Sequence, residues 1–406
     1  MAFKVVREAK RTIPPLPKTA RGFGIHIDGT TAGGKRLIYT NGRFVVIRSL
    51  EDQFEATVFG GHQCNVNVAK FSPNGEWVAS GDCQGNVIVW GARTQTAKNQ
   101  LRANNSVLDI SWGADNSQII AAGDGGDGYF AKVFRIDSSN SIGEISGHSK
   151  KILSCAVKPS KPHFIATASE DFSVNTYKGV PYRHQKTQRL FKNYPNCVRY
   201  NRAGDAFAAV GSDRRICLFG GEGELLKQVD AKAEGAHKGS IYSCCFSPDG
   251  AKLLTSSGDK TLKVWDAASL SCEHTFSAGG RVEDMQVSCL WLEGFIVSVS
   301  LSGAINFFEE GEGAPSRTWN VSLFTKGPPR RDQEHRGAPV GEEAVLGGDR
   351  WEDCGMGLGA LCLDVFQRRP RRKADRSDGR FFGWRQNLFG RVRRQLLCVR
   401  CRRQEN

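Results

Sequence analysis

One pattern returns along most of this 406-residue chain at intervals of about 43 residues. Its landmarks are the dipeptides Gly61-His62, Gly147-His148 and Ala236-His237, which lie 86 and 89 residues apart, so each interval holds two copies of the repeat. Self-similarity at a fixed period of this length indicates an architecture in which one small unit is stacked many times. The nature of that unit therefore decides the fold.

The unit is clearest over residues 236–266, where apolar runs of strand length alternate with turn signals. A strand expected over 241–246 leads into the turn Ser-Pro-Asp-Gly, and two further strands are expected over 252–255 and 262–265. Such punctuated runs predict antiparallel hairpins. Related patterns occur at 23–48, 60–91, 105–137, 147–178, 195–220 and 286–308, which makes seven units.

Each unit is followed by one more candidate strand, so seven four-stranded blades are expected. Blades arranged radially cover each other's apolar faces, which predicts an all-β, seven-bladed β-propeller over residues 20–323. Residues 1–19 form a separate N-terminal segment in this scheme. No overlap strand that would close the ring is evident, unless residues 3–6 supply it.

Polar residues recur at fixed positions of the unit: a His at its start, an Asp in a turn, a Ser two residues before that Asp and a Trp six residues after it. One complete set is His237, Ser257, Asp259 and Trp265, and a set with the Trp replaced is His148, Ser169, Asp171 and Tyr177. This spacing is that of the hydrogen-bonded network in WD-repeat blades. Buried polar groups must be fully paired, so we expect a structural role for these residues.

Motifs for catalysis are missing from the sequence, which shows no nucleophile elbow, no zinc-protease helix and no local cluster of acid, base and nucleophile. Cys398 and Cys401 form a lone C-x-x-C without the paired knuckles of a zinc ribbon. We therefore expect no enzymatic activity, no cofactor and no metal. Propellers more often hold partners with loops on one face.

The 13 cysteines are scattered and many lie in apolar runs, which favours reduced thiols in the cytoplasm over a disulfide framework. No stretch of about 18 uncharged apolar residues occurs, so no membrane span is expected.

Composition changes sharply near the end of the last unit. Residues 326–406 contain 17 Arg and 2 Lys against 11 Asp and Glu, whereas residues 1–325 contain 17 Arg and 20 Lys. We expect an Arg-rich, disordered tail over 324–406. Two interpretations of this tail remain open: translation of an intron or of another reading frame, or a basic arm that binds acidic surfaces such as nucleic acid.

Particular phrases within the units resemble the first propeller of the actin-interacting protein 1 family, over about residues 20–322. They are TNGRFVVIRSLED (40–52), VAKFSPNGEWVASGD (68–82), GEISGHSKKILSCAVKPSKPHFIATASEDF (143–172), NCVRY (196–200), HKGSIYSCCFSPD (237–249) and SCLWLEGFIVSVSLSG (288–303). Family members have two propellers, and the tail resembles no part of them.

The resemblance implies a cytoskeletal protein that binds actin filaments and cofilin and promotes cofilin-dependent filament disassembly. Matched motif by motif, the family's actin-facing positions correspond to Asp124, Glu170, Asp171, Tyr182 and Tyr194. An aromatic residue beside carboxylates is a plausible interaction hot spot. Asp171 could equally be the structural turn Asp of its blade, and Tyr182 could be a packing residue.

Two other functions remain open at this point. The chain could be a general WD-repeat scaffold or adaptor for protein complexes, with the family phrases retained only for folding. It could also associate with nucleic acid through the basic tail.

Overall fold

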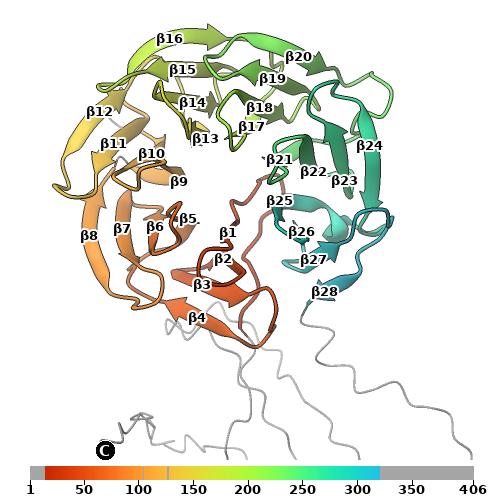
Figure 1. Cartoon of the computed structure of the whole chain (residues 1–406), viewed down its shortest axis with the longest axis horizontal. Coiled ribbons are helices and arrows are strands. Elements are labelled where there is room, and N and C mark those ends of the chain that lie inside the picture. The colour runs from red at the N-terminus through yellow and green to blue at the C-terminus, as the bar shows by residue number, and fades with distance from the viewer. Residues whose placement is uncertain (1–13, 104, 126–127, 321–406) are drawn as a thin grey trace, which may run out of the picture. The chain divides into compact units, whose positions relative to one another are not determined.

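The computed structural model describes residues 14–103, 105–125 and 128–320, and these form seven four-stranded antiparallel sheets around a common centre (Figure 1). The predicted all-β, seven-bladed propeller is therefore confirmed. The candidate closing strand at residues 3–6 and the tail predicted over 324–406 both lie outside the described residues. No helix in the described part of the chain is long and apolar enough to cross a membrane.

Each blade consists of four consecutive strands, numbered from the centre outwards. Blades 1 to 4 contain β1 (Asp28–Thr30), β2 (Arg36–Asn41), β3 (Phe44–Ser49), β4 (Ala56–Phe59), β5 (Val66–Phe71), β6 (Trp77–Asp82), β7 (Asn86–Gly91), β8 (Ala97–Arg102), β9 (Ser106–Trp112), β10 (Gln118–Asp124), β11 (Ala131–Arg135), β12 (Ser141–Ile145), β13 (Ile152–Val157), β14 (Phe164–Ser169), β15 (Val174–Lys178) and β16 (Arg183–Gln188). Blades 5 to 7 contain β17 (Pro195–Tyr200), β18 (Ala206–Gly211), β19 (Ile216–Gly220), β20 (Leu225–Val229), β21 (Ile241–Phe246), β22 (Lys252–Ser257), β23 (Thr261–Asp266), β24 (Cys272–Ser277), β25 (Gln286–Leu292), β26 (Phe295–Ser300), β27 (Ile305–Phe308) and β28 (Arg317–Trp319).

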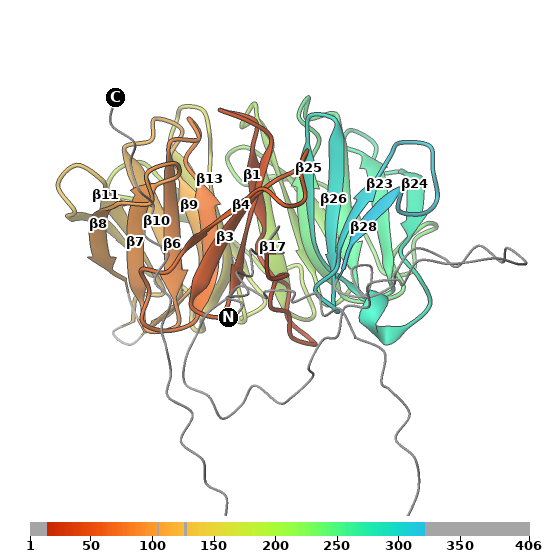
Figure 2. The same cartoon turned by 90° about the horizontal axis from the view of Figure 1, so that it is seen from below.

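Antiparallel order divides the loops between two faces of the ring, which Figure 2 shows from the side. The turns between second and third strands emerge on the same face as the connections from one blade to the next. We call this the entry face. It includes the 3-10 helix Val282–Asp284 in the connection from β24 to β25.

The apolar core lies between neighbouring blades. In one cluster, Val68 and Val87 of blade 2 pack against Ile110 and Trp112 of blade 3. Strands near the centre are buried on both sides, as in β14, whereas the outermost strands such as β16 are largely exposed. This pattern explains why a single blade could not be stable by itself.

The ring closes between blades 7 and 1 by side-chain packing, since each sheet is made only of its own consecutive strands. Leu37 and Tyr39 of blade 1 share a core cluster with Val297, Phe307 and Trp319 of blade 7. This packing holds the two blades together in place of a shared strand.

The segment before β1 also crosses this seam. The Thr19 hydroxyl donates to the carbonyl of Leu301 over 2.5 Å, and the amide of Ile25 donates to that of Val287 over 3.2 Å. In the opposite direction, the guanidinium of Arg317 donates to the carbonyl of Leu50 over 3.0 Å. Hydrogen bonds from both ends of the ring thus supplement the apolar seam.

Candidate functional site

Buried hydrogen bonds between a His and an Asp side chain join the start of a blade to a turn on the entry face in several blades. In blade 6, the two ring nitrogens of His237 lie 2.9 Å from Asp259 Oδ2 and 2.8 Å from Thr255 Oγ1, and Trp265 Nε1 donates to the same Thr255 hydroxyl over 2.9 Å. Burial lowers the pKa of His237, against the opposing effect of Asp259. A neutral imidazole therefore links the turn to the middle of the second strand.

The hydroxyl in this network differs from the expected one. It belongs to Thr255, four residues before the Asp, because the imidazole reaches the middle of β22 and not its end. Ser257, two residues before the Asp, instead accepts from the amide of Asp259 over 3.2 Å. Ser169 in blade 4 donates to the carbonyls of Lys150 and Lys151.

Blade 4 has the same arrangement with a tyrosine in place of the tryptophan. His148 lies 2.9 Å from Asp171 Oδ2 and 2.7 Å from Thr167 Oγ1. The Tyr177 hydroxyl donates to the carbonyl of Ser146 over 2.8 Å and accepts from Asn175 Nδ2 over 3.2 Å.

Blade 2 contains a complete network that the sequence analysis did not single out. His62 lies 3.1 Å from Asp82 Oδ2 and 2.7 Å from Ser80 Oγ, to which Trp90 Nε1 also donates. Burial raises the pKa of Asp82, but hydrogen bonds from Asn86 and His62 outweigh burial and bring the pKa to about 2. Trp90 follows Asp82 by eight residues and not by six, so the spacing used for blades 4 and 6 does not find this network.

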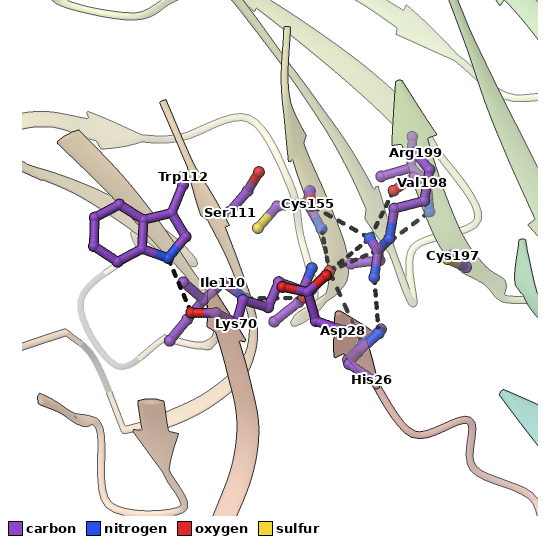
Figure 3. Close-up of polar contacts among 12 residues, drawn as sticks. His26, Asp28, Lys70, Ile110, Ser111, Trp112, Cys155, Cys197, Val198 and Arg199 are labelled. Atoms are coloured by element: carbon purple, nitrogen blue, oxygen red, sulfur yellow. Dashed lines mark hydrogen bonds and ion pairs between the residues drawn. The ribbon is translucent and has the colours of Figure 1, made fainter. Parts of the chain in front are cut away.

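At the centre of the ring, a buried ion cluster is assembled from the inner strands (Figure 3). Asp109 of β9 is fully buried; its carboxylate lies 2.7 Å from Lys70 Nζ and 3.0 Å from Arg199 Nη1. The hydroxyl of Ser154 donates to Asp109 over 2.8 Å, and Arg199 Nη2 lies 3.0 Å from His26 Nδ1. We call these five residues the central plug.

The central plug separates two hollows of the propeller centre. A cavity of about 560 Å³ opens toward the entry face, where Phe23, Glu170 and Tyr194 line it. A second cavity of about 490 Å³ is lined by Pro73 and other residues of the opposite face, and His26 borders both. Burial raises the pKa of Asp109, but the charges of Arg199, His26 and Lys70 outweigh it and hold the pKa far below its usual range.

On the entry face, aromatic and charged side chains gather beside the first of these cavities. Phe172, at the tip of the β14–β15 turn, is 38% exposed, and Tyr194 before β17 is 39% exposed, with ring centroids 5.5 Å apart. Lys150 Nζ lies 5.9 Å from the centroid of the Phe172 ring. Glu170 Oε1 lies 3.0 Å from Lys151 Nζ. We call this group of five the aromatic cluster.

The structure brings together only some of the residues proposed from the family resemblance. Glu170 and Tyr194 belong to the aromatic cluster, and Asp124 is exposed at the end of β10 on the same face. Asp171 lies beside them in sequence, but its side chain is only 11% exposed, and it binds His148, the amide of Ser149 and the hydroxyl of Ser173.

Tyr182, another of the residues proposed from the family resemblance, is a buried loop aromatic. It lies in the β15–β16 connection, on the face opposite the entry face, and is 5% exposed. Its hydroxyl donates to Gln118 Oε1 of blade 3 over 3.1 Å, and burial raises its pKa to about 12. Tyr182 therefore lies where a packing residue would, which is the second of the two interpretations given for it above. Phe172, which the sequence analysis passed over, is the aromatic exposed next to Glu170.

Within the described residues, no group of three or more His, Cys, Asp and Glu side chains is arranged to hold a metal ion. The nine cysteines of the described ranges are free thiols.

Comparison with family models finds the WD domain, G-beta repeat, at residues 54–91, 139–178 and 232–266. These three segments contain the His–Asp networks of blades 2, 4 and 6.

Among curated proteins, the chain is 38% identical over 317 residues to "Actin-interacting protein 1" of Drosophila melanogaster, which covers 77% of this chain and 51% of that protein. It is 39% identical over 317 residues to "Actin-interacting protein 1-2" of Arabidopsis thaliana, covering 75% and 51%. It is 36% identical over 310 residues to "WD repeat-containing protein 1" of Gallus gallus, covering 75% and 50%. The chain spans about half the length of these relatives. Its matched part is a WD-repeat propeller of the actin-interacting protein 1 family.

Proposed function

We propose that this chain binds actin filaments at the cytoskeleton and promotes their disassembly together with cofilin, without catalysing a reaction of its own. The observation that carries the proposal is the 38% identity over 317 residues to a protein named for its interaction with actin.

The aromatic cluster is the part of the surface best suited to such binding. Phe172 and Tyr194 offer adjacent, partly exposed rings, and large rigid side chains bury much area at little cost in conformational entropy. Glu170 and Lys151 beside them supply charges that can orient a partner. Asp124 extends the acidic part of this surface along the entry face.

Co-sedimentation of the full chain with filaments, with and without cofilin, tests this proposal. The test variant combines Phe172→Asn with Tyr194→Ser. Asparagine is chosen because Phe172 has a φ of +68°, a left-handed conformation that Asn tolerates better than most residues. The matched control is Leu226→Ser, which removes a 52% exposed apolar residue from the outer strand β20.

Losing hot-spot side chains worth at least about 2 kcal/mol weakens binding on the order of 30-fold. We expect that loss for the double variant on cofilin-decorated filaments, with an unchanged melting temperature, and native affinity for Leu226→Ser. If the wild-type chain does not pellet with decorated filaments, the actin proposal is wrong. If the double variant binds as the wild type does, the assignment to the aromatic cluster is wrong.

Filament imaging tests the cofilin-dependent part separately. With cofilin present, the chain should increase the number of severing events per filament length, and the double variant should not. An equal severing rate with and without the chain would contradict a role in disassembly, even where binding is intact.

A further inference from the structure

Two cysteine side chains meet on the entry face of blade 2. Cys64 lies in the connection from β4 to β5, and Cys83 follows Asp82 in the β6–β7 turn. The amide of Cys83 donates to the carbonyl of Asn65 over 2.9 Å, which places Cys64 one residue from the position opposite Cys83. The Cys64 side chain interacts with both the Asp82 carboxylate and the Cys83 thiol. Both thiols are free, and Cys83 is exposed.

Equivalent positions in other blades show that this proximity is a property of the repeat. In blade 4, the amide of Glu170 donates to the carbonyl of Lys151 as that of Cys83 does to Asn65, so Lys150 and Glu170 hold the positions of Cys64 and Cys83. In blade 6, Gly239 and Gly258 hold these positions, and a Cβ atom added to Gly239 would lie 3.0 Å from the carbonyl carbon of Gly258. A side chain two residues after the His therefore lies against the first residue of the turn, and in blade 2 both positions are cysteines.

We propose that Cys64 and Cys83 are a redox-active pair, oxidised to a disulfide in the folded protein by hydrogen peroxide or by a small-molecule disulfide such as oxidised glutathione. Directly opposed residues of antiparallel strands have Cα atoms about 4.5–5.5 Å apart, within the range that a disulfide spans. Cys64 is one residue from such a position, and its side chain already interacts with the Cys83 thiol.

The environment assigns different roles to the two thiols. Burial, followed by the hydrogen bond to Asp82 and the neighbouring Cys83, raises the pKa of Cys64 to about 12. Cys64 therefore remains protonated at neutral pH, while the exposed Cys83 meets the oxidant first. Thiolate is the form of cysteine that attacks peroxides and disulfides.

With hydrogen peroxide, the Cys83 thiolate attacks one oxygen, the O–O bond breaks, and a sulfenic acid forms at Cys83 with hydroxide as leaving group. The Cys64 sulfur then attacks the Cys83 sulfur, and the sulfenic hydroxyl leaves with the Cys64 proton as water. The Asp82 carboxylate, which is hydrogen-bonded to Cys64, can accept that proton during its transfer. In sum, two thiols and one peroxide give one disulfide and two waters. With oxidised glutathione, two exchange steps release two glutathione thiols.

The product would join the connection between blades 1 and 2 to the β6–β7 turn. Asn65, next to Cys64, lines the 560 Å³ cavity of the entry face. The proposed disulfide thus fixes one wall of that cavity without any change in the blade core.

Peptide mapping of the full chain tests the proposal directly. The folded protein is treated with hydrogen peroxide or oxidised glutathione, its remaining thiols are blocked with N-ethylmaleimide, and it is digested with trypsin. Cleavage after Arg48, Lys70 and Arg93 yields the peptides 49–70 and 71–93, which contain one cysteine each. A linked pair of these two peptides identifies the disulfide by mass, separately from any bond to another cysteine.

We expect the linked peptides from the wild type and from the control Cys272→Ser, their disappearance on reduction, and their absence from Cys83→Ser. In Cys64→Ser treated with oxidised glutathione, Cys83 should accumulate as the glutathione mixed disulfide, because the second thiol is missing. The proposal is overturned if both peptides of the treated wild type carry N-ethylmaleimide, or if the link forms only after the protein has been unfolded in urea.

Discussion

Replacing Asp109 with asparagine should destabilise the propeller more than any other single change of similar size. The substitution keeps the shape of the side chain but removes the one carboxylate that contacts both Lys70, at 2.7 Å, and Arg199, at 3.0 Å. The two cations would then face each other across a buried site, since Asp109 itself has no exposed surface.

Removing one partner of a buried ion pair costs about 3–5 kcal/mol, because the remaining charge is left without compensation. In addition, the amide group cannot accept every hydrogen bond that Asp109 now receives, including those from the Ser154 hydroxyl at 2.8 Å and the Cys155 amide at 3.0 Å. We therefore expect the free energy of unfolding to fall by about 3–5 kcal/mol at pH 7.

Urea unfolding followed by tryptophan fluorescence measures this loss as a lower midpoint with an unchanged slope. The folded pKa of Asp109 is depressed, so its stabilising effect is complete above the unfolded value near 4 and decreases as the pH falls further. The difference between variant and wild type should accordingly shrink below about pH 4. Asp137→Asn, at an exposed position, is the control. A loss for Asp109→Asn within about 0.5 kcal/mol of this control would show that the buried carboxylate does not stabilise the ring.

Two further substitutions test the packing. Tyr182→Phe should lower the free energy of unfolding by about 1–3 kcal/mol in the same urea titration, because the buried Gln118 carbonyl loses its donor; a neutral effect would mean that the hydroxyl reaches water. Trp319→Ala should cost about 3–5 kcal/mol, since its buried ring lies 4.6 Å from the Phe307 ring of the same blade and 4.1 Å from the Arg48 guanidinium across the closing seam. If the seam did not depend on Trp319, calorimetry would give the variant and the wild type the same melting temperature.

The repeat made the blades predictable, because strand alternation and turn residues act locally and recur in every unit. His237, Asp259 and Trp265 could be matched by spacing alone, although the hydroxyl that joins them lies in the middle of a strand and was misplaced by two residues. The seam between blades 7 and 1 could not be foreseen, because it depends on complementary packing and not on a shared strand.

The central plug was beyond the reach of the sequence for a related reason. Lys70 and Arg199 hold the same position in the inner strands of their blades, but Asp109 holds another position in a third blade, and only closure of the ring brings the three together. Phe172 and Tyr182 illustrate the same difficulty on the surface: both are aromatic residues beside turns, and only the packing of neighbouring blades decides that one is exposed and the other buried.

Hydroxyl-radical footprinting of the full chain on cofilin-decorated filaments tests most directly whether the entry face binds actin. Side chains that become buried at an interface lose reactivity, and aromatic rings are among the most reactive. If the entry face binds actin, Phe172 and Tyr194 are protected, and the reactivity of Leu225 and Leu226 on the outer strand β20 is unchanged. Protection of β20 with full reactivity at Phe172 and Tyr194 would contradict binding through the entry face.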